Sequence, residues 1–217
     1  MADLRGAAWS VDRYEPDQAR EVEACLARAF FPDPLFGFFA PDRRREYDLL
    51  PDVFRAFLTD ARRFGEIWTA TTDSAAHRVA GVAVWLPPGA MPRSRRRETI
   101  MQVRLGRLLL RGQHLHYRLP HLRTGLSLLA AVDGVHPTEP HWYLAVLGTD
   151  PVMQGRGLGS ALLRPTLEEA DRTGVPCYLE TQKEENLAFY GRHGFALDRT
   201  VSVPGSPTVW CMTRRSR

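Results

Sequence analysis

Residues 154–160 read Gln154-Gly155-Arg156-Gly157-Leu158-Gly159-Ser160, and this stretch decides the fold of the chain. An apolar run over residues 142–147 precedes it, and an amphipathic segment over residues 158–172 follows. This order predicts a strand, a glycine-rich turn and a helix. Glycines at alternate positions let several backbone N–H groups converge on one anion, and the helix start adds its positive dipole end. The stretch therefore predicts a site for a phosphate-bearing ligand.

The composition is that of an ordinary globular protein. Of the 217 residues, 44% are apolar and 25% charged, with a net charge of +4. No apolar run reaches the ~20 residues that a membrane helix needs, and no secretory apolar region follows Met1. We expect a single domain over residues 1–217, a cytoplasmic location and no membrane partner. The densest basic run, residues 93–97, lacks interleaved aromatic residues, so we expect no nucleic acid partner.

Neither the cysteines nor the histidines show the spacing of a metal site. Three cysteines lie far apart in the sequence, which predicts buried reduced thiols: Cys25, Cys177 and Cys211. Three histidines lie near one another, but no acid or cysteine accompanies them at ligand spacing: His114, His116 and His121. We therefore expect no metal.

Hydrophobic periodicity predicts a mixed α/β sheet flanked by helices. Helices are expected over residues 17–30, 43–63, 93–110, 158–173 and 185–193. Strands are expected over residues 11–14, 66–71, 79–86, 142–149, 177–180, 195–203 and 208–214, the second and third forming a hairpin around residues 73–77. Prolines 32 and 34 should end the first helix, Pro51 divides the second, and Gly112, Pro120 and Gly125 predict a broken helix over residues 111–135.

Two nucleotide-binding interpretations of the glycine loop fit less well than a third. Gly155, Gly157 and Ser160 approximate a dinucleotide fingerprint, but residues 150–153 separate them from the strand, and too little chain follows for a second half. A triphosphate loop requires Gly-Lys-Ser/Thr, whereas the charged loop residue here is Arg156. The pyrophosphate of coenzyme A, with the rest of the cofactor running back along strand 142–149, fits this geometry.

Two motifs resemble those of the GNAT acetyltransferase superfamily. The loop Gln154 to Gly159, preceded by Asp150-Pro151, is one, and residues 186–195 (Asn-Leu-Ala-Phe-Tyr-Gly-Arg-His-Gly-Phe) are the other. Residues 139–214 are similar to the puromycin N-acetyltransferases of that superfamily, and the first half is less similar. The resemblance implies a GNAT fold, with a central mixed, mostly antiparallel, twisted sheet of about seven strands flanked by helices. It also implies acetyl-CoA (coenzyme A) as cofactor.

The resemblance carries over to individual residues. Those implied to bind the cofactor are Leu147, Gly148, Thr149, Gln154, Gly155, Arg156, Gly157, Leu158, Gly159, Ser160, Asn186, Phe189 and Tyr190. Backbone N–H groups of residues 147–149 would support an oxyanion, and Phe189 would line the pantetheine arm. Tyr190 would protonate the departing thiolate, because a phenol with a pKa near 10 keeps its proton at neutral pH.

The general base and the acceptor pocket are less specified. Glu180 ends a strand beside the expected opening of the sheet, and Glu139 and His136 precede the cofactor strand, so each is a candidate base. We expect the acceptor to contact Phe31, Asp33, Phe36 and Glu180. Asp33 would attract the cationic amine, and residues 93–135 would form a helical insertion that covers the acceptor site.

The sequence thus predicts an N-acetyltransferase that transfers acetyl from acetyl-CoA directly to the primary amine of a small molecule. A puromycin-like antibiotic is one candidate. A protein or peptide N-acetyltransferase, and a non-catalytic acyl-CoA-binding sensor, are the alternatives. We expect a small-molecule amine as partner and a monomer or homodimer as the assembly.

Overall fold

A computed structural model describes residues 8–31, 33–39, 42–73, 79–110 and 115–216 of the chain. Seven strands form one sheet: β1 (Trp9–Arg13), β2 (Glu66–Thr72), β3 (Val79–Leu86), β4 (Trp142–Thr149), β5 (Cys177–Thr181), β6 (Ala196–Val201) and β7 (Val209–Arg214). The strand order is β1-β2-β3-β4-β5-β7-β6, and β4 with β5 is the parallel pair among antiparallel neighbours. The predicted fold class is confirmed.

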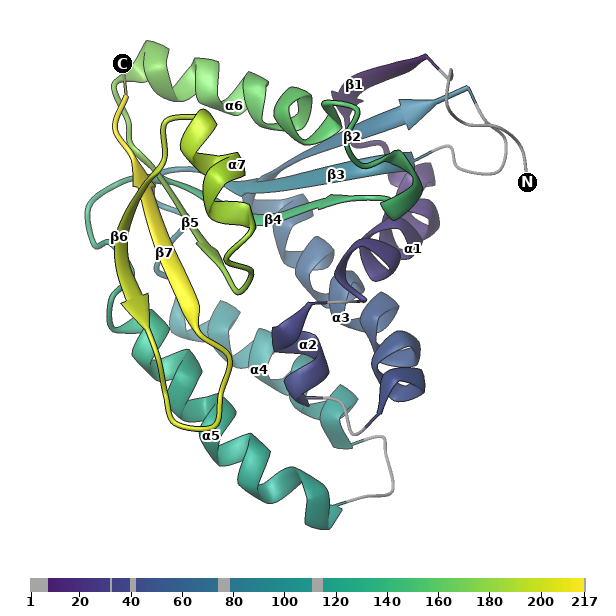
Figure 1. Cartoon of the computed structure of the whole chain (residues 1–217), viewed down its shortest axis with the longest axis vertical. Coiled ribbons are helices and arrows are strands. Elements are labelled where there is room, and N and C mark those ends of the chain that lie inside the picture. Colours follow the sequence, from purple (N-terminus) through teal and green to yellow (C-terminus); the bar gives the residue numbers. More distant parts are fainter. Residues whose placement is uncertain (1–7, 32, 40–41, 74–78, 111–114, 217) are drawn as a thin grey trace.

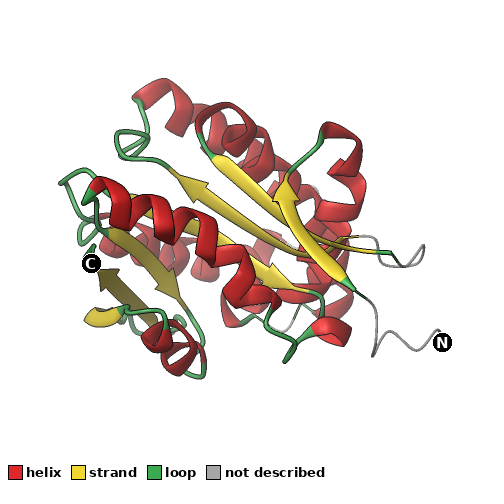
Figure 2. Ribbon diagram, turned by 90° about the horizontal axis from the view of Figure 1, so that it is seen from above, coloured by secondary structure: helices red, strands yellow, loops and turns green. Residues whose placement is uncertain are grey.

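Helices cover both faces of the sheet (Figures 1 and 2). They are α1 (Ala19–Phe30), α2 (Pro34–Phe39), α3 (Arg43–Phe64), α4 (Arg95–Leu110), α5 (Leu115–Asp133), α6 (Leu158–Thr173) and α7 (Asn186–Arg192), with short 3₁₀ turns at Pro16–Gln18 and Pro151–Met153. On one face α6 packs against β2, β3 and β4, while α1 and α3 pack on the other face. Within the described residues no helix has the length and apolar character to cross a bilayer.

The core follows the predicted apolar periodicities. Leu158, Leu162 and Leu163 of α6 are at most 1% exposed and pack against strand residues such as Leu144 and Leu179. The opposite face buries α1 and α3 residues against β3. Burial at about 25 cal/mol per Å² of apolar surface is what holds the two helical layers on the sheet. The three cysteines are buried free thiols, as predicted.

Two predicted helix breaks are wrong. Pro51 lies inside the continuous helix α3, because Leu50 and Phe54, each 1% exposed, hold both halves of the helix on the same core. Residues 115–133 form the single helix α5, with Pro120 and Gly125 inside it. A Cβ at Gly125 would lie 2.6 Å from Phe39 Cζ, so this glycine permits a close approach of α2 and α5. Residues 111–114, including His114, and most of the hairpin turn at 73–77 lie outside the described residues.

Helix α2 was not expected from the sequence. Residues 34–39 form one short helix directly after α1. Phe36 packs edge-on against Phe30 at 5.8 Å between ring centroids. Phe36 therefore holds α2 on α1, where the transfer of its ring from water stabilises the packing.

Candidate functional site

Strands β4 and β5 part in the middle of the sheet. Their parallel pairing ends at Leu144 and Leu179, yet β4 continues beside β3 as far as Thr149. At the fork the register with β3 shifts, because Trp85 pairs with Leu144 and Val84 with Val146, which leaves Ala145 as a bulge. Beyond Leu144, β4 therefore has an edge without a strand partner, and this edge faces the gap between β4 and β5.

The direction of the backbone groups along that edge follows from one hydrogen bond. The N–H of Asp150 donates to the carbonyl of Ala80 in β3 at 2.9 Å. Because successive residues of a strand point to opposite sides, the N–H of Gly148 also faces β3, and those of Leu147 and Thr149 face the gap. Gln154 Nε2 donates to the Thr149 carbonyl at 3.3 Å, which agrees with this assignment.

Gly148 serves the packing of α1. A Cβ at this position would lie 2.9 Å from Leu26 Cδ2 and 3.0 Å from Phe30 Cε2. The missing side chain therefore lets α1 pack closely on β4. Of the three predicted backbone donors, Leu147 and Thr149 have the orientation that an oxyanion requires.

The glycine loop joins this edge to helix α6. Gly155 and Gly157 adopt left-handed backbone angles, with φ of 76° and 85°, and open space surrounds the positions where their Cβ atoms would stand. Gly157 is the N-cap of α6, and no side chain caps this helix end. Before the loop, buried Asp150 accepts the N–H of Val152 at 3.2 Å and pairs with Arg28 at 2.7 Å. The first N–H groups of α6 are thus presented to an anion by a fixed turn.

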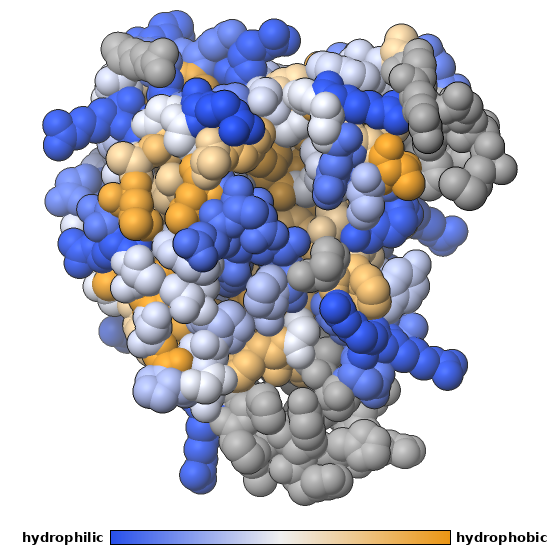
Figure 3. Space-filling model, in the orientation of Figure 1, coloured by the Kyte–Doolittle hydropathy of each residue, from blue (hydrophilic) through white to orange (hydrophobic). Residues whose placement is uncertain are grey.

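A cavity of about 500 Å³ connects the β4 edge, the loop and helix α7. In Figure 3 the front of the molecule is hollowed at this level, and apolar side chains line the hollow. The lining residues are Ala29, Phe30, Asp33, Leu147, Gly148, Thr149, Met153, Gln154, Gly155, Gly157, Leu158, Gly159, Ser160, Lys183, Glu185, Asn186, Phe189, Tyr190 and Arg192. Every predicted cofactor residue is among them except Arg156, whose Nη2 donates to the Val152 carbonyl at 3.5 Å.

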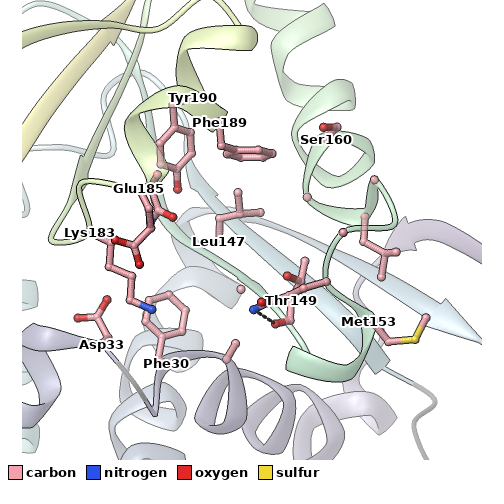
Figure 4. Close-up of a pocket in the computed structure, with 18 of the residues that line it drawn as sticks. Phe30, Asp33, Leu147, Thr149, Met153, Ser160, Lys183, Glu185, Phe189 and Tyr190 are labelled. Carbon is pink, nitrogen blue, oxygen red and sulfur yellow. Dashed lines mark hydrogen bonds between the residues drawn. The ribbon is translucent and has the colours of Figure 1, made fainter. Parts of the chain in front are cut away.

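Helix α7 brings the second motif against the loop. A Cβ at Gly159 would lie 3.1 Å from Phe189 Cζ, so the glycine allows the Phe189 ring to close over the start of α6. Tyr190 is 7% exposed and lines the cavity (Figure 4). Burial, and secondarily the charge of Asp33, raise the pKa of the Tyr190 phenol well above its ordinary value. The phenol therefore keeps its proton at neutral pH.

The far end of the cavity carries three charged side chains, Asp33, Lys183 and Glu185 (Figure 4). Asp33 is 6% exposed, and its Oδ1 accepts the N–H of Leu35 at 2.9 Å. Burial raises the pKa of the Asp33 carboxyl above its usual value, Glu185 raises it further, and Lys183 opposes the rise. Phe30 forms an apolar wall beside these groups.

Sequence reasoning placed only part of this end. Of the charged lining residues, Asp33 was predicted, whereas Lys183, Glu185 and Arg192 were not assigned to the site. Lys183 and Glu185 lie just before the Asn186 motif, and this adjacency was the available signal.

Two predicted substrate residues lie outside the lining of the cavity. Phe31 packs edge-on against Tyr47 at 5.6 Å, with the Arg43 guanidinium over its ring. Phe36 packs against Phe54 at 5.5 Å and belongs to the α1–α3 core.

Glu180 lies at the fork but outside the lining residues, within a polar network of its own. Its Oε2 accepts the Tyr143 hydroxyl at 2.8 Å, and its Oε1 lies 3.2 Å from His136 Nδ1. His136 Nε2 is 3.1 Å from His141 Nε2, and His141 Nδ1 is 2.8 Å from the carbonyl of Glu139. The Glu139 side chain itself is exposed and does not line the cavity.

The contact of His141 with a carbonyl defines which of its ring nitrogens donates. A carbonyl only accepts, so His141 Nδ1 carries a hydrogen, and burial lowers the pKa of His141 and favours the neutral ring. His141 Nε2 is then an acceptor, which requires His136 Nε2 to donate. Both oxygens of Glu180 are already engaged, one by His136 and the other by the Tyr143 hydroxyl.

No group of three or more His, Cys, Asp or Glu residues within the described ranges is arranged to hold a metal ion.

Comparison with known proteins agrees with this geometry. The model of the Acetyltransferase (GNAT) family matches residues 112–195. An uncharacterised N-acetyltransferase of Schizosaccharomyces pombe is 24% identical over 198 residues, which cover 87% of this chain and 75% of that protein.

Two solved structures share the fold. One, described as histone acetyltransferase HPA2 and related acetyltransferase from Corynebacterium glutamicum, superposes with a TM-score of 0.70 at 21% identity over 97% of both chains. An agmatine N-acetyltransferase superposes with a TM-score of 0.58 at 15% identity, over 95% of this chain and 99% of that one. These similarities show that the chain has the GNAT fold, and the part of it that resembles the acetyltransferase family is residues 112–195.

Proposed function

We propose that the protein is an N-acetyltransferase that transfers acetyl from acetyl-CoA directly to the primary amine of a small molecule. One observation carries the proposal: a single cavity contains the unpaired β4 edge, the uncapped N-terminus of α6 and the Tyr190 phenol. Direct acyl transfer needs an oxyanion donor, an anchor for the donor molecule and a proton for the leaving thiolate.

The residues present fit coenzyme A. The left-handed glycines leave the space in front of the α6 N-terminus open, where a Cβ at either position would stand next to no other atom. This end suits a pyrophosphate, because uncapped N–H groups and the helix dipole both favour an anion. Phe189 and Leu147 line the stretch between the loop and Tyr190 and suit an apolar arm. When bound, acetyl-CoA supplies an electrophilic thioester carbonyl.

The protein's own groups supply the other requirements. The N–H groups of Leu147 and Thr149 point into the gap and would stabilise charge that develops on a carbonyl oxygen, since their orientation is fixed by the sheet before the reaction begins. Tyr190 would give its proton to the departing sulfur.

For the acceptor's proton, the cavity carboxylates are better placed than Glu180 or Glu139. Glu180 has both oxygens engaged by His136 and Tyr143, and the Glu139 side chain is exposed. Asp33 lines the cavity, and its raised pKa brings it nearer to the working range of a general base. We therefore assign Asp33 to receive the proton and to attract the cationic amine.

The lining of the acceptor end also favours one class of amine. A half-enclosed end with Phe30 as a wall and two carboxylates suits a small amine that combines an apolar group with a positive charge. A puromycin-like antibiotic has this character, and the similarity of residues 139–214 to puromycin N-acetyltransferases points the same way. The segment 93–135, helices α4 and α5, would cover the acceptor side.

The test is thiol release from acetyl-CoA against a panel of amines: puromycin, aminonucleosides, aminoglycosides, polyamines including agmatine, and peptides. Acceleration by a small amine with product mass increased by one acetyl group supports the proposal. Acceleration by peptides alone would favour a protein acetyltransferase, an activity named for one of the structural relatives. Acetyl-CoA binding with no acceleration by any amine would favour a non-catalytic sensor and refute the enzyme.

A further inference from the structure

Lys183 is the only lysine of the chain, because the other 28 of its 29 Lys and Arg residues are arginine. It lies in the turn between β5 and α7, and it lines the cavity in which acetyl transfer is proposed. Figure 4 shows its side chain extending toward the Phe30 ring and Asp33. The chain therefore places its single side-chain amine at the acceptor end of its own cavity.

The backbone of Lys183 is held, while its amine is not. The N–H of Lys183 donates to Thr181 Oγ1 at 3.4 Å, and its carbonyl accepts the N–H of Asn186 at 3.1 Å. No hydrogen bond or ion pair of Nζ is found with any residue that the structure describes, although Asp33 is close enough to feel its charge. Because the backbone of Lys183 is held and its four-carbon side chain is not, the amine can reach different positions at the acceptor end of the cavity.

Of lysine and arginine, only lysine can act as a nucleophile. A guanidinium stays protonated in proteins, whereas an alkylamine attacks a carbonyl once it has lost a proton. Asp33 and Glu185 line the same end of the cavity and can take up that proton. Lys183 thus meets the chemical requirements that the cavity sets for an acceptor amine.

We propose that Lys183 is a self-acetylation site, modified in cis when acetyl-CoA is bound and no external amine occupies the acceptor end. This inference rests on the proposed function. The Nζ lone pair forms a bond to the thioester carbonyl carbon, and the carbon–sulfur bond breaks. In all, the ammonium nitrogen gives up two protons to the cavity carboxylates, and the sulfur gains one from Tyr190. One of the two protons returns to the Tyr190 phenolate and the other leaves to solvent, so that the products are acetyl-lysine, free thiol and one released proton.

Acetylation would change the acceptor end. It removes the one positive charge that Lys183 sets beside Asp33 and Glu185, and it adds an acetyl group within the cavity. External amine and Lys183 would compete for the same acetyl group, so an accepted substrate should protect Lys183.

The sequence makes the test unambiguous. The folded protein is incubated with acetyl-CoA and no amine, then digested with trypsin. Unmodified chain gives two peptides, residues 173–183 and 184–192, whereas acetyl-Lys183 blocks the cut and joins them into residues 173–192 with one added acetyl group. The controls are the same protein unfolded in urea, a synthetic peptide of residues 173–192, and Lys183→Arg, which keeps the charge without a nucleophilic amine.

The expected result is modification about tenfold or more faster in the folded protein than in urea or in the peptide, because the cavity holds amine and thioester together. The rate per molecule should not depend on protein concentration, and an accepted amine from the panel should slow it. Equal rates in folded and unfolded protein, or a rate that rises with protein concentration, would overturn the proposal. So would an unmodified Lys183 in protein that acetylates an external amine, a result that leaves the proposed function standing. Absence of both reactions refutes both.

Discussion

The two ends of the cavity differ in how the chain builds them. The loop end takes most of its residues from one continuous stretch, residues 147–160, and closes it with Phe189 of α7. The acceptor end combines Phe30 and Asp33 from the first half of the chain with Lys183 and Glu185 from the second. A local motif can therefore specify the loop end, whereas the acceptor end exists only once α1 and the β5–α7 turn have packed around the sheet.

From this difference we expect the loop end to carry the steps that are the same for every acceptor, and the acceptor end to select among amines. Substitutions at the two ends should then separate into effects on turnover or cofactor affinity and effects on the acceptor amine.

Tyr190→Phe should show the largest effect. The ring keeps its packing against Phe195, whose ring lies 5.9 Å away, but the proton donor is lost. We expect kcat to fall about 100-fold, with the Kd for acetyl-CoA unchanged, because general acid catalysis typically contributes this much. Steady-state kinetics and isothermal titration measure the two quantities. An unaltered kcat would remove Tyr190 from the proton-donor role.

Asp33→Asn should come next. Asparagine can still accept the N–H of Leu35, so α2 should keep its start while the charge is lost. We expect kcat/KM for a cationic amine to fall about tenfold, with acetyl-CoA binding retained, since a buried charge contact is worth about 1–3 kcal/mol. Glu185→Gln, at an exposed position of the same cavity, is the matched control and should have the smaller effect. A larger loss for Glu185→Gln would transfer the assignment to Glu185.

Gly159→Ala should act on the cofactor alone. The added Cβ would stand 3.1 Å from Phe189 Cζ and displace that ring from the start of α6. We expect the Kd for acetyl-CoA to rise a few-fold, by roughly 1 kcal/mol, with no change in relative preference among amines. Gly191→Ala in α7, where nothing lies within 4 Å of the new Cβ, is the control. A change in amine preference with Gly159→Ala would break the separation between the two ends.

The smallest expected effect is on stability at mildly acidic pH. Burial lowers the pKa of His141 and of His193 below the ordinary value of 6.5, so the unfolded chain binds protons more readily than the folded one. The free energy of unfolding should therefore fall as pH drops below 6.5, by a small part of the ~5–15 kcal/mol of a typical domain.

His141→Gln offers the matched variant for that measurement. Its amide can donate to the Glu139 carbonyl and accept from His136, so the network is kept without a titrating ring. Urea unfolding at several pH values should show a weaker pH dependence for the variant. An identical dependence in both proteins would assign the acid sensitivity to His193, beside Ser160 at the loop end.

Sequence patterns predicted the elements well where a local rule governs them. The helix after Gly157 and all seven strands follow from periodicity and glycine placement. The failures, at Pro51, Gly125 and α2, are positions where contact with a distant element decides the outcome. Gly125 is an example. Glycine inside a helical pattern predicts a break, but here its missing side chain makes room for Phe39 of α2, and α5 continues through it.

The candidate site divides in the same way. The lining residues at the loop end were predictable, because most of them lie in one of two contiguous motifs with a backbone requirement that glycine or a helix start reveals. Phe31 and Phe36 lie outside the cavity lining, which the sequence could not show, because aromatic character does not tell whether a ring faces a core or a pocket. The contacts of Glu180 with His136 and Tyr143 also depend on the fork between β4 and β5.

By itself, the sequence determined a glycine turn that opens a helix, a sheet of this class and a second motif that carries the tyrosine, because these depend on backbone freedom and apolar periodicity within short stretches. Only the tertiary structure decided which charged groups meet at the acceptor end. Asp33 and Lys183 are far apart in the chain, and it is the packing of α1 on β4, at Gly148, that brings the first to the second.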